Sequence, residues 1–139
     1  MKKVMISGKF DPPHEGHIDH LRKAHRLGNW LIVVVQSDRG VIATKGHCNI
    51  KFWARRALME GLLLLYSIRG EVVEGVDLDG KSLKSLKHFE PDIFAKGGDR
   101  TPDNMPEDEV ELCKELGIGI IYGVGDLLNA SSRMEVKRE

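Results

Sequence analysis

The fold is decided near the start of the chain, by the stretch K-V-M-I-S-G-K-F-D-P-P-H-E-G-H over residues 3–17. Lys3 to Ser7 is a short β-prone run that Gly8 breaks, and it predicts a buried strand. Pro12 and Pro13 exclude a helix from the loop that follows, because each fixes φ and restricts the residue before it. An apolar residue then recurs every three positions, which predicts an amphipathic helix over residues 15–27: Ile18, Leu21, Ala24 and Leu27.

Strands and helices alternate along the rest of the chain. Further strands are expected over residues 30–35, 70–74, 92–95 and 118–122, and further helices over 49–66, 82–88 and 106–116, with a last helix near Ser131. Residues 37–47 are expected to form an irregular crossover. This alternation predicts an α/β fold with a parallel sheet covered on both sides. Ligands bind such sheets beyond the carboxyl ends of the strands, so the residues that follow each strand are the candidates for a site.

Composition narrows the classes of protein that this chain can belong to. Its 139 residues predict a single domain over 1–139. Lys and Arg number 21 and Asp and Glu also 21, so the net charge is zero and we expect no nucleic-acid or membrane partner. Two cysteines cannot build a disulfide framework. With no expected signal peptide and no apolar run long enough to span a bilayer, the sequence predicts a cytoplasmic location.

Two histidines stand directly after the first predicted strand. His14 and His17 are three residues apart where a helix begins, so their rings fall on one face. A helix N-terminus offers N–H donors and a partial positive charge, and is therefore an anion site. Imidazoles there can stabilise a phosphate, as neutral donors or as imidazolium ions.

The ordered pattern G-x-F-D-x-x-H-x-G-H over residues 8–17 resembles the signature of the cytidylyltransferase-like nucleotidyltransferases. That superfamily includes glycerol-3-phosphate cytidylyltransferases and heptose-phosphate adenylyltransferases. The resemblance covers nearly the whole chain, because later segments follow the order that the family has. It implies a Rossmann-like, doubly wound sheet of about five parallel strands with helices on both faces.

The resemblance also implies roles for individual residues. Lys45 resembles a phosphate-gripping lysine, and of the adjacent Arg55 and Arg56 it favours Arg56 as the arginine that faces the cleft. Catalytic roles are thereby expected for His14, His17, Lys45 and Arg56. Nucleotide-binding roles are expected for Gly8, Lys9, Phe10, His14, His17, Lys96, Gly97, Gly98, Asp99, Ser131 and Ser132. Acceptor-binding roles are expected for Asp38, Lys45 and Arg56.

Three segments depart from the pattern of the family, and one of them, residues 49–53, lacks the proline and the acidic residue often seen before the arginine. Lys9 stands where the family commonly has a small hydroxyl residue, and we interpret it as a phosphate contact. The Ser/Thr-rich segment that holds the β- and γ-phosphates is reduced to Ala130-Ser131-Ser132 and lacks the arginine often found before it. Asp11 is interpreted as a structural residue that orders the loop carrying His14.

The expected function is transfer of a nucleotidyl group from an NTP to a phosphorylated small molecule, with release of pyrophosphate. Sugar phosphates, polyol phosphates and cofactor precursors are the candidate acceptors. The K-G-G-D sequence over residues 96–99 favours ATP slightly over CTP, whose transferases the short length resembles. Mg²⁺ is expected as a cofactor held mainly by the nucleotide phosphates, with no metal ligand from the protein.

Other interpretations stay open at this stage. The same fold could serve as a non-catalytic nucleotide-binding or regulatory module, which the reduced Ser-Ser segment favours and the complete histidine pair opposes. A zinc site that uses the histidines lacks a third ligand at a clear spacing. Assembly as a homodimer is compatible with the sequence.

Overall fold

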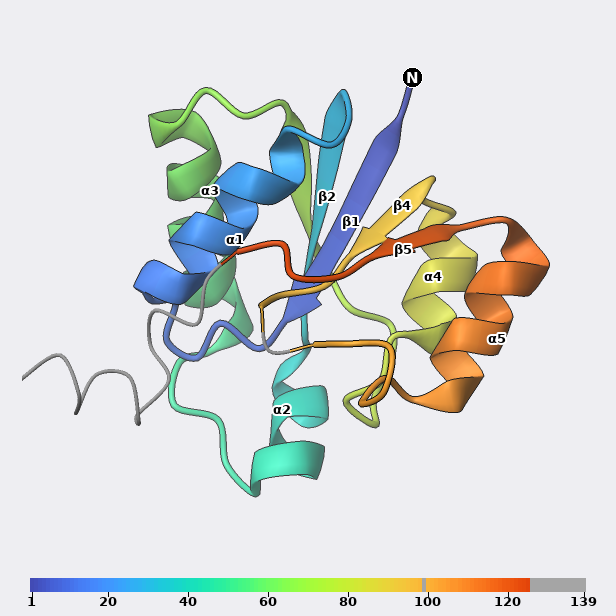
Figure 1. The fold of residues 1–139 in the computed structure, drawn as a ribbon. Coiled ribbons are helices and arrows are strands. Elements are labelled where there is room, and N and C mark those ends of the chain that lie inside the picture. The colour runs from blue at the N-terminus through green and yellow to red at the C-terminus, as the bar shows by residue number, and fades with distance from the viewer. Residues whose placement is uncertain (99, 126–139) are drawn as a thin grey trace, which may run out of the picture.

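The computed structural model describes residues 1–98 and 100–125. The strands of this part of the chain form one five-stranded parallel sheet (Figure 1). Its strands are β1 (Lys3–Gly8), β2 (Trp30–Val35), β3 (Gly70–Glu74), β4 (Ile93–Ala95) and β5 (Gly119–Ile121). The order across the sheet is β3-β2-β1-β4-β5. From the central strand β1 the chain first runs outward through β2 and β3, then returns to the other side of β1. The order therefore reverses between β1 and β4, which is the switch point where such sheets bind ligands.

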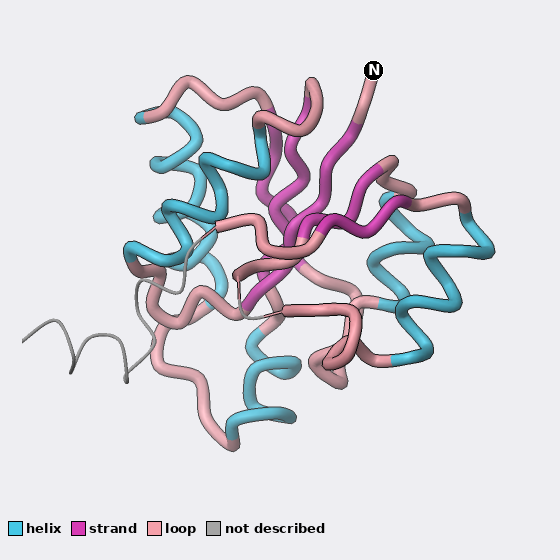
Figure 2. The backbone as a smooth tube through the Cα atoms, viewed as in Figure 1, coloured by secondary structure: helices cyan, strands magenta, loops and turns pink. Residues whose placement is uncertain are grey.

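Helices cover both faces of this sheet, as Figures 1 and 2 show. On one face lie α1 (Glu15–His25) and α3 (Phe52–Leu65), and on the other lie α4 (Leu83–Phe89) and α5 (Glu107–Leu116). The predicted α/β, doubly wound fold is thus confirmed. None of the helices in the described part of the chain is long and apolar enough to cross a membrane.

Alternation along β1 divides its side chains between two apolar cores. Val4 and Ile6 point to the α1 and α3 side, whereas Met5 points to the α4 and α5 side. All three side chains are fully buried, as expected of a central parallel strand. The central strand is thereby fixed from both faces, and the loop that leaves it starts from a rigid support.

One predicted segment was wrong. Residues 37–47 were expected to be irregular, but they contain the helix α2 (Asp38–Lys45), which lies below the carboxyl end of β2 in Figure 1. Ser37 caps its start, since its hydroxyl oxygen accepts a hydrogen bond from the Gly40 N–H at 3.0 Å. Gly46 ends it in the left-handed conformation at φ +83°. The next helix begins at Phe52, not at Asn49.

Candidate active site

A cavity of about 590 Å³ opens beyond the carboxyl ends of the strands. Its wall is built from segments that follow each of the five strands, together with the first turns of α1 and the start of α5. The expected residues that line it are Gly8, Lys9, Phe10, His14, His17, Lys96, Gly97 and Gly98. Residues predicted from widely separated parts of the sequence therefore meet at the switch point.

His14 and His17 are held by hydrogen bonds to the backbone at the start of α1. The Gly16 N–H donates to His14 Nδ1 at 3.1 Å, and the His14 N–H donates to His17 Nδ1 at 3.2 Å. The two rings stack with centroids 3.7 Å apart and planes 22° from parallel. Because a backbone N–H can only donate, each Nδ1 must be unprotonated, and the neutral ring carries its proton on Nε2. The capping box thus selects the tautomer of both histidines.

Burial keeps both imidazoles neutral. It is the main cause that lowers the pKa of His17 to about 3, and the neighbouring His14, His20 and Lys45 lower it further. Burial also lowers the pKa of His14, with Glu15 acting in the opposite direction. Near neutral pH the pair therefore presents two Nε2–H donors without a positive charge of its own.

Cationic side chains gather around the same cavity. Burial lowers the pKa of Lys9, and so do the charges of Lys45 and Arg100. Lys96 and Arg100 line the cavity with Lys9, and the Lys96 ammonium lies 4.4 Å from the centroid of the Phe94 ring. Mutual repulsion of this kind is relieved when an anion binds between the charges. Although the whole chain is neutral, this site favours a polyanion.

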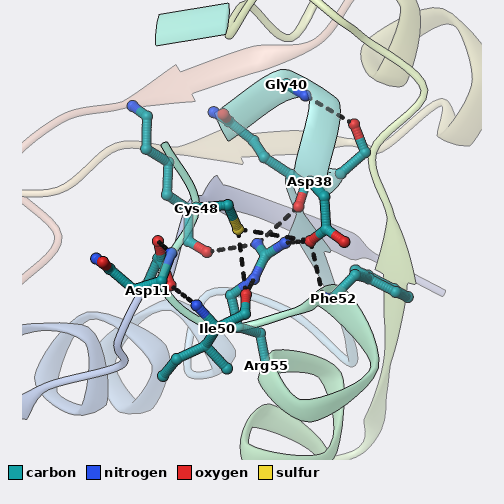
Figure 3. Close-up of polar contacts among 11 residues, drawn as sticks. Asp11, Asp38, Gly40, Cys48, Ile50, Phe52 and Arg55 are labelled. Atoms are coloured by element: carbon teal, nitrogen blue, oxygen red, sulfur yellow. Dashed lines mark hydrogen bonds and ion pairs between the residues drawn. The ribbon is translucent and has the colours of Figure 1, made fainter. Parts of the chain in front are cut away.

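Arg55 is fully buried beneath the loop after β1, where it ties several segments together (Figure 3). Its Nη1 donates to the carbonyls of Lys9 at 2.8 Å and Gln36 at 2.7 Å, and its Nε donates to that of Ile50 at 2.7 Å. Its Nη2 forms an ion pair with Asp38 Oδ1 at 2.7 Å. One side chain thus joins the segments after β1 and β2 to the start of α3.

The predicted preference for Arg56 over Arg55 was wrong. Arg56 is half exposed and pairs with Glu60 on the outer surface of α3, with Nε and Oε1 3.5 Å apart, and it does not line the cavity. A helix turns about 100° per residue, so only one of two adjacent arginines can face inward. The apolar stripe of α3 includes Met59 and Leu63, four and eight residues after Arg55, and this stripe faces the sheet.

The other two expected acceptor-binding residues also lie outside the cavity wall. The Asp38 carboxylate is engaged by Arg55 and by the Phe52 N–H at 2.8 Å. Burial opposes its ionisation, but these hydrogen bonds and the charge of Arg55 hold its pKa below the usual value. Lys45 is exposed at the end of α2, yet close enough for its charge to lower the pKa of Lys9 and His17.

Asp11 anchors the loop that carries the histidines, in agreement with its expected structural role. Its carboxylate accepts hydrogen bonds from the N–H groups of Asn49 at 2.7 Å and Ile50 at 2.6 Å. Burial alone would raise the pKa of Asp11, but these bonds, together with the charges of Arg55 and Lys45, lower it. Asp11 and Arg55 therefore hold the same loop from two sides.

Sequence reasoning missed several polar residues of the wall. His20, to which the sequence assigned no role in the site, lines the cavity, and its Nδ1–H donates a hydrogen bond to the Val124 carbonyl. Its position three residues after His17 was a usable signal. Glu109, which belongs to no motif in the sequence, is buried in the wall, and its carboxylate accepts a hydrogen bond from the Ser82 N–H at 3.3 Å. Burial raises the pKa of Glu109.

Gln36 is a further wall residue that no motif indicated. Its side-chain oxygen is the one buried side-chain polar atom without a hydrogen-bond partner among residues 1–98 and 100–125. Asp99, Ser131 and Ser132, three of the expected nucleotide-binding residues, lie outside the described residues. The described residues of the wall nevertheless place fixed hydrogen-bond donors and cations at the switch point of a doubly wound sheet. This arrangement suits a nucleotidyltransferase.

Comparison with known proteins supplies the family. Residues 5–132 match the family described as cytidylyltransferase-like, and the chain belongs to that family of nucleotidyltransferases. It is 30% identical over 131 residues to the bifunctional protein HldE of Desulfatibacillum aliphaticivorans, and 35% identical over 103 residues to that of Nitrosococcus oceani. These matches cover 94% and 73% of this chain, but only 25% and 21% of the relatives. The chain therefore spans about a quarter or less of these curated relatives.

Solved structures agree with this assignment. A lipopolysaccharide core biosynthesis protein from Thermoplasma volcanium superposes with a TM-score of 0.67 at 28% identity, over 91% of this chain and 97% of that one. A bifunctional NMN adenylyltransferase/ADP ribose pyrophosphatase from Francisella tularensis gives a TM-score of 0.69 at 14% identity. The latter covers 98% of this chain and 41% of the other, and it supports the fold alone.

Proposed function

We propose that this protein transfers a nucleotidyl group from an NTP to a phosphorylated sugar or polyol and releases pyrophosphate. The observation that carries the proposal is the pair of Nε2–H donors of His14 and His17, fixed by the start of α1 beside a cavity rich in cations. An oxygen of the acceptor phosphate attacks the α-phosphorus in line and forms the new P–O bond. The bond to the β-phosphate oxygen breaks, and pyrophosphate leaves with its electron pair.

Catalysis by this site rests on positioning and charge stabilisation. The Nε2–H groups of His14 and His17 donate to the α- and β-phosphate oxygens, where negative charge develops in the transition state. Lys9 and Arg100, which line the same cavity, neutralise the phosphates. No side chain needs to form a covalent intermediate, because in-line displacement requires only that both substrates be held in register.

Mg²⁺ is proposed to bind together with the nucleotide, held mainly by its phosphates. Among the described residues no group of three His, Cys, Asp or Glu side chains could hold a metal ion. Mg²⁺ usually keeps several waters and binds substrate phosphates, so phosphate oxygens and water suffice as its ligands here. Bound there, it would neutralise phosphate charge, in addition to what Lys9 and Lys96 supply.

Polar groups of the cavity wall and the name of one relative support a sugar phosphate or polyol phosphate as the acceptor. Gln36, Ser82 and Glu109 place polar groups around the cavity, and such groups suit the hydroxyls of a sugar or polyol. The name of the Thermoplasma volcanium protein, lipopolysaccharide core biosynthesis, also favours a sugar phosphate. For the nucleotide we favour ATP over CTP, on the K-G-G-D sequence that follows β4.

The test is release of pyrophosphate from ATP or CTP in the presence of a panel of sugar phosphates and polyol phosphates. Turnover with one acceptor should fall about 10²- to 10³-fold in His17→Ala, the scale for loss of one charge-stabilising donor. His88→Ala is the matched control, because His88 is exposed on α4 and does not line the cavity. Nucleotide binding without pyrophosphate release from any pair would instead identify a non-catalytic nucleotide-binding module.

A further inference from the structure

Two buried oxygen acceptors in the cavity wall lack the hydrogen-bond donors that such groups usually have. The side-chain oxygen of Gln36 is shielded from solvent, and no described residue donates a hydrogen bond to it. Glu109 is only 4% exposed, and the Ser82 N–H, at 3.3 Å, is the only donor to its carboxylate within the described chain. Most buried polar groups of native proteins are hydrogen-bonded, so an acceptor with donors missing in a cavity wall indicates a ligand that brings them.

These acceptors reach the cavity from the face of the sheet opposite to the histidine pair. Glu109 belongs to α5 and Ser82 directly precedes α4, whereas the start of α1, on the other face, carries the histidines (Figure 1). Val34 packs in the core on the α4 and α5 side. Since side chains alternate along a strand, Gln36 lies on that side too. The cavity is therefore reached by hydrogen-bond donors from one face of the sheet and by acceptors from the other.

One short segment holds the two acceptor side chains close together. Gln36 Nε2 donates to the Gly80 carbonyl at 3.4 Å, which leaves the oxygen as the part of the amide that a ligand can use. Glu109 accepts from Ser82, two residues further on, so the two contacted residues have Cα atoms at most about 7 Å apart. The Ser82 hydroxyl is also hydrogen-bonded to that of Ser7, at 3.0 Å, which ties this segment to the end of β1. The hydroxyl groups of one small molecule can therefore reach both acceptors.

The charge of Glu109 indicates which part of a ligand lies beside it. Glu109 is the only acidic residue among the described residues that line the cavity. Burial raises its pKa, but the charges of Lys96 and Arg100 act in the opposite direction and favour the carboxylate. A carboxylate repels phosphate groups, whereas it accepts hydrogen bonds from hydroxyl groups without repulsion. The surroundings of Glu109 therefore suit an uncharged, hydroxyl-bearing part of a substrate.

The position of the two acceptors in the sheet favours the acceptor substrate over the ribose of the nucleotide. Gln36 follows β2, and the segment that contains Gly80 and Ser82 follows β3. Both strands lie on one side of the central strand β1. Residues 96–98, which we assign to the nucleotide, follow β4 on the other side of β1.

We propose that Gln36 and Glu109 determine the specificity for the acceptor, and that each accepts a hydrogen bond from a different hydroxyl group of a sugar phosphate or polyol phosphate. This inference rests on the nucleotidyl transfer proposed above and narrows the acceptor to a phosphate ester with at least two free hydroxyl groups. An alkyl phosphate leaves both buried acceptors without donors. Sites built to hydrogen-bond a hydroxyl group reject analogues that lack it.

The preference between acceptors with and without hydroxyl groups tests the proposal. Glycerol 3-phosphate is compared with propyl phosphate, and mannose 1-phosphate with cyclohexyl phosphate, by kcat/KM from pyrophosphate release with ATP and by Kd from calorimetry. The parent should prefer the hydroxylated member of at least one pair by about 100-fold, about tenfold for each hydrogen bond. Gln36→Leu and Glu109→Gln should each reduce this preference about tenfold, and should change the KM for the acceptor rather than the KM for ATP.

The matched control is Glu111→Gln, because Glu111 is an exposed glutamate of the same helix and lies outside the cavity wall. It should keep the preference of the parent. Gln36→Asn, which keeps the amide on a shorter side chain, is a second variant that should lose preference. Circular dichroism spectra like that of the parent show that each variant is folded.

Three results would overturn the proposal: a parent that prefers neither hydroxylated probe, variants that weaken both members of a pair equally, or a change confined to the KM for ATP. The last result would assign Gln36 and Glu109 to the ribose. If calorimetry shows the preference and its loss in the variants while no pair releases pyrophosphate, the proposed transfer fails and the recognition of hydroxyl groups stands.

Discussion

Arg55 shows how one buried residue can position a site that it does not touch. Its guanidinium donates hydrogen bonds to the carbonyls of Lys9 and Gln36, two cavity-lining residues that directly follow β1 and β2. A lysine could keep the charge but not the fork of donors that meets these carbonyls and Asp38 together. Arg55 is therefore a positioning residue of the loop after β1, and its loss would affect stability first.

Arg55→Lys is expected to lower the free energy of unfolding by about 3 kcal/mol, because buried carbonyls and part of the Asp38 charge lose their partner. The matched control is Arg56→Lys, which changes an exposed pair on the same helix and should stay within about 0.5 kcal/mol of the parent. Urea unfolding followed by circular dichroism measures both. Equal losses in the two variants would contradict the inward placement of Arg55.

His17 allows a prediction on pH. Its pKa in the folded protein is about 3, below the 6.5 of an unperturbed histidine, so the unfolded chain takes up this proton first. The stability contributed by a neutral His17 is therefore present above about pH 6.5 and is lost as the pH falls toward 3. In the nucleotide-free protein, the NMR signals of the His17 ring should not titrate between about pH 8 and 5. A midpoint near 6.5 would show that the ring is not buried as described.

At the scale of single residues, the sequence was enough to predict that His14 and His17 lie together at the start of a helix. It did not lead to the correct choice between Arg55 and Arg56 as the inward-facing arginine. The pair is encoded by local spacing, three residues apart at a helix start. The arginine choice depends on which side of α3 faces the sheet, and the apolar stripe through Met59 and Leu63 held that information. Resemblance to the family outweighed this periodic signal in the prediction, whereas the periodic signal was correct.

At the scale of elements, the start of α1 is both a structural cap and a donor array. His14 occupies the N-cap of α1. Its ring Nδ1 accepts a hydrogen bond from the backbone N–H of Gly16, and its backbone N–H donates one to the ring Nδ1 of His17. Histidine is not among the preferred N-cap residues, so His14 stabilises the start of the helix less than asparagine or aspartate would. It does, however, place an imidazole in the wall of the cavity. Substitutions of His14 can therefore separate its role as a helix cap from its proposed role as a hydrogen-bond donor to phosphate.

His14→Asn is expected to preserve the cap, since asparagine is a preferred N-cap residue, and the free energy of unfolding should stay close to that of the parent. His14→Ala should lose about 1 kcal/mol, the usual cost of a lost cap. Both variants lack the Nε2–H donor, so pyrophosphate release should fall at least tenfold in each. Thermal unfolding and turnover, measured on the same preparations, test this. Recovery of turnover in His14→Asn would reduce His14 to a capping residue.

The helix α2 marks the limit of element prediction. Its sequence D-R-G-V-I-A-T-K mixes a glycine with β-branched residues, which have modest helix propensity, and so no periodic signal stands out. The stabilising features are local and tertiary: the Ser37 cap, the Gly46 end, and the Arg55–Asp38 pair that fixes the first turn. Only the first two could be recognised in the sequence, and the third required the fold.

At the scale of the whole molecule, the site is made by a topology that gathers residues from distant segments. Gln36, Ser82 and Glu109 reach the cavity from the segments after β2, before α4 and within α5, and no local pattern links them. Charge is gathered in the same way. The chain has no net charge, yet the charges of Lys45 and Arg100 both act on Lys9. The sequence predicted Lys9 and Lys45 as phosphate contacts, whereas the contribution of Arg100 depends on the fold.

Lys9→Ser is therefore expected to weaken triphosphate binding by about 1–2 kcal/mol, the range for a hydrogen bond to a charged group. Lys9 lies in the cavity wall, where burial and the nearby cations lower its pKa, so an anion gains from its charge at close range. Isothermal calorimetry at low and moderate salt should show a reduced salt dependence in the variant. Binding of the nucleoside monophosphate should weaken less, because it presents less charge.

The control for this prediction is Lys114→Ser, which removes the same charge from an exposed position on α5. If overall charge attracted the nucleotide, the two variants would lose affinity equally, since each changes the net charge by one. If the locally gathered cations attract it, only Lys9→Ser should weaken binding, because screening limits the reach of a distant exposed charge to about 10 Å at moderate salt. Equal triphosphate affinities in Lys9→Ser and the parent at low salt would exclude Lys9 as a phosphate ligand. The attraction would then have to come from Lys96 and Arg100, on the side of the cavity that follows β4.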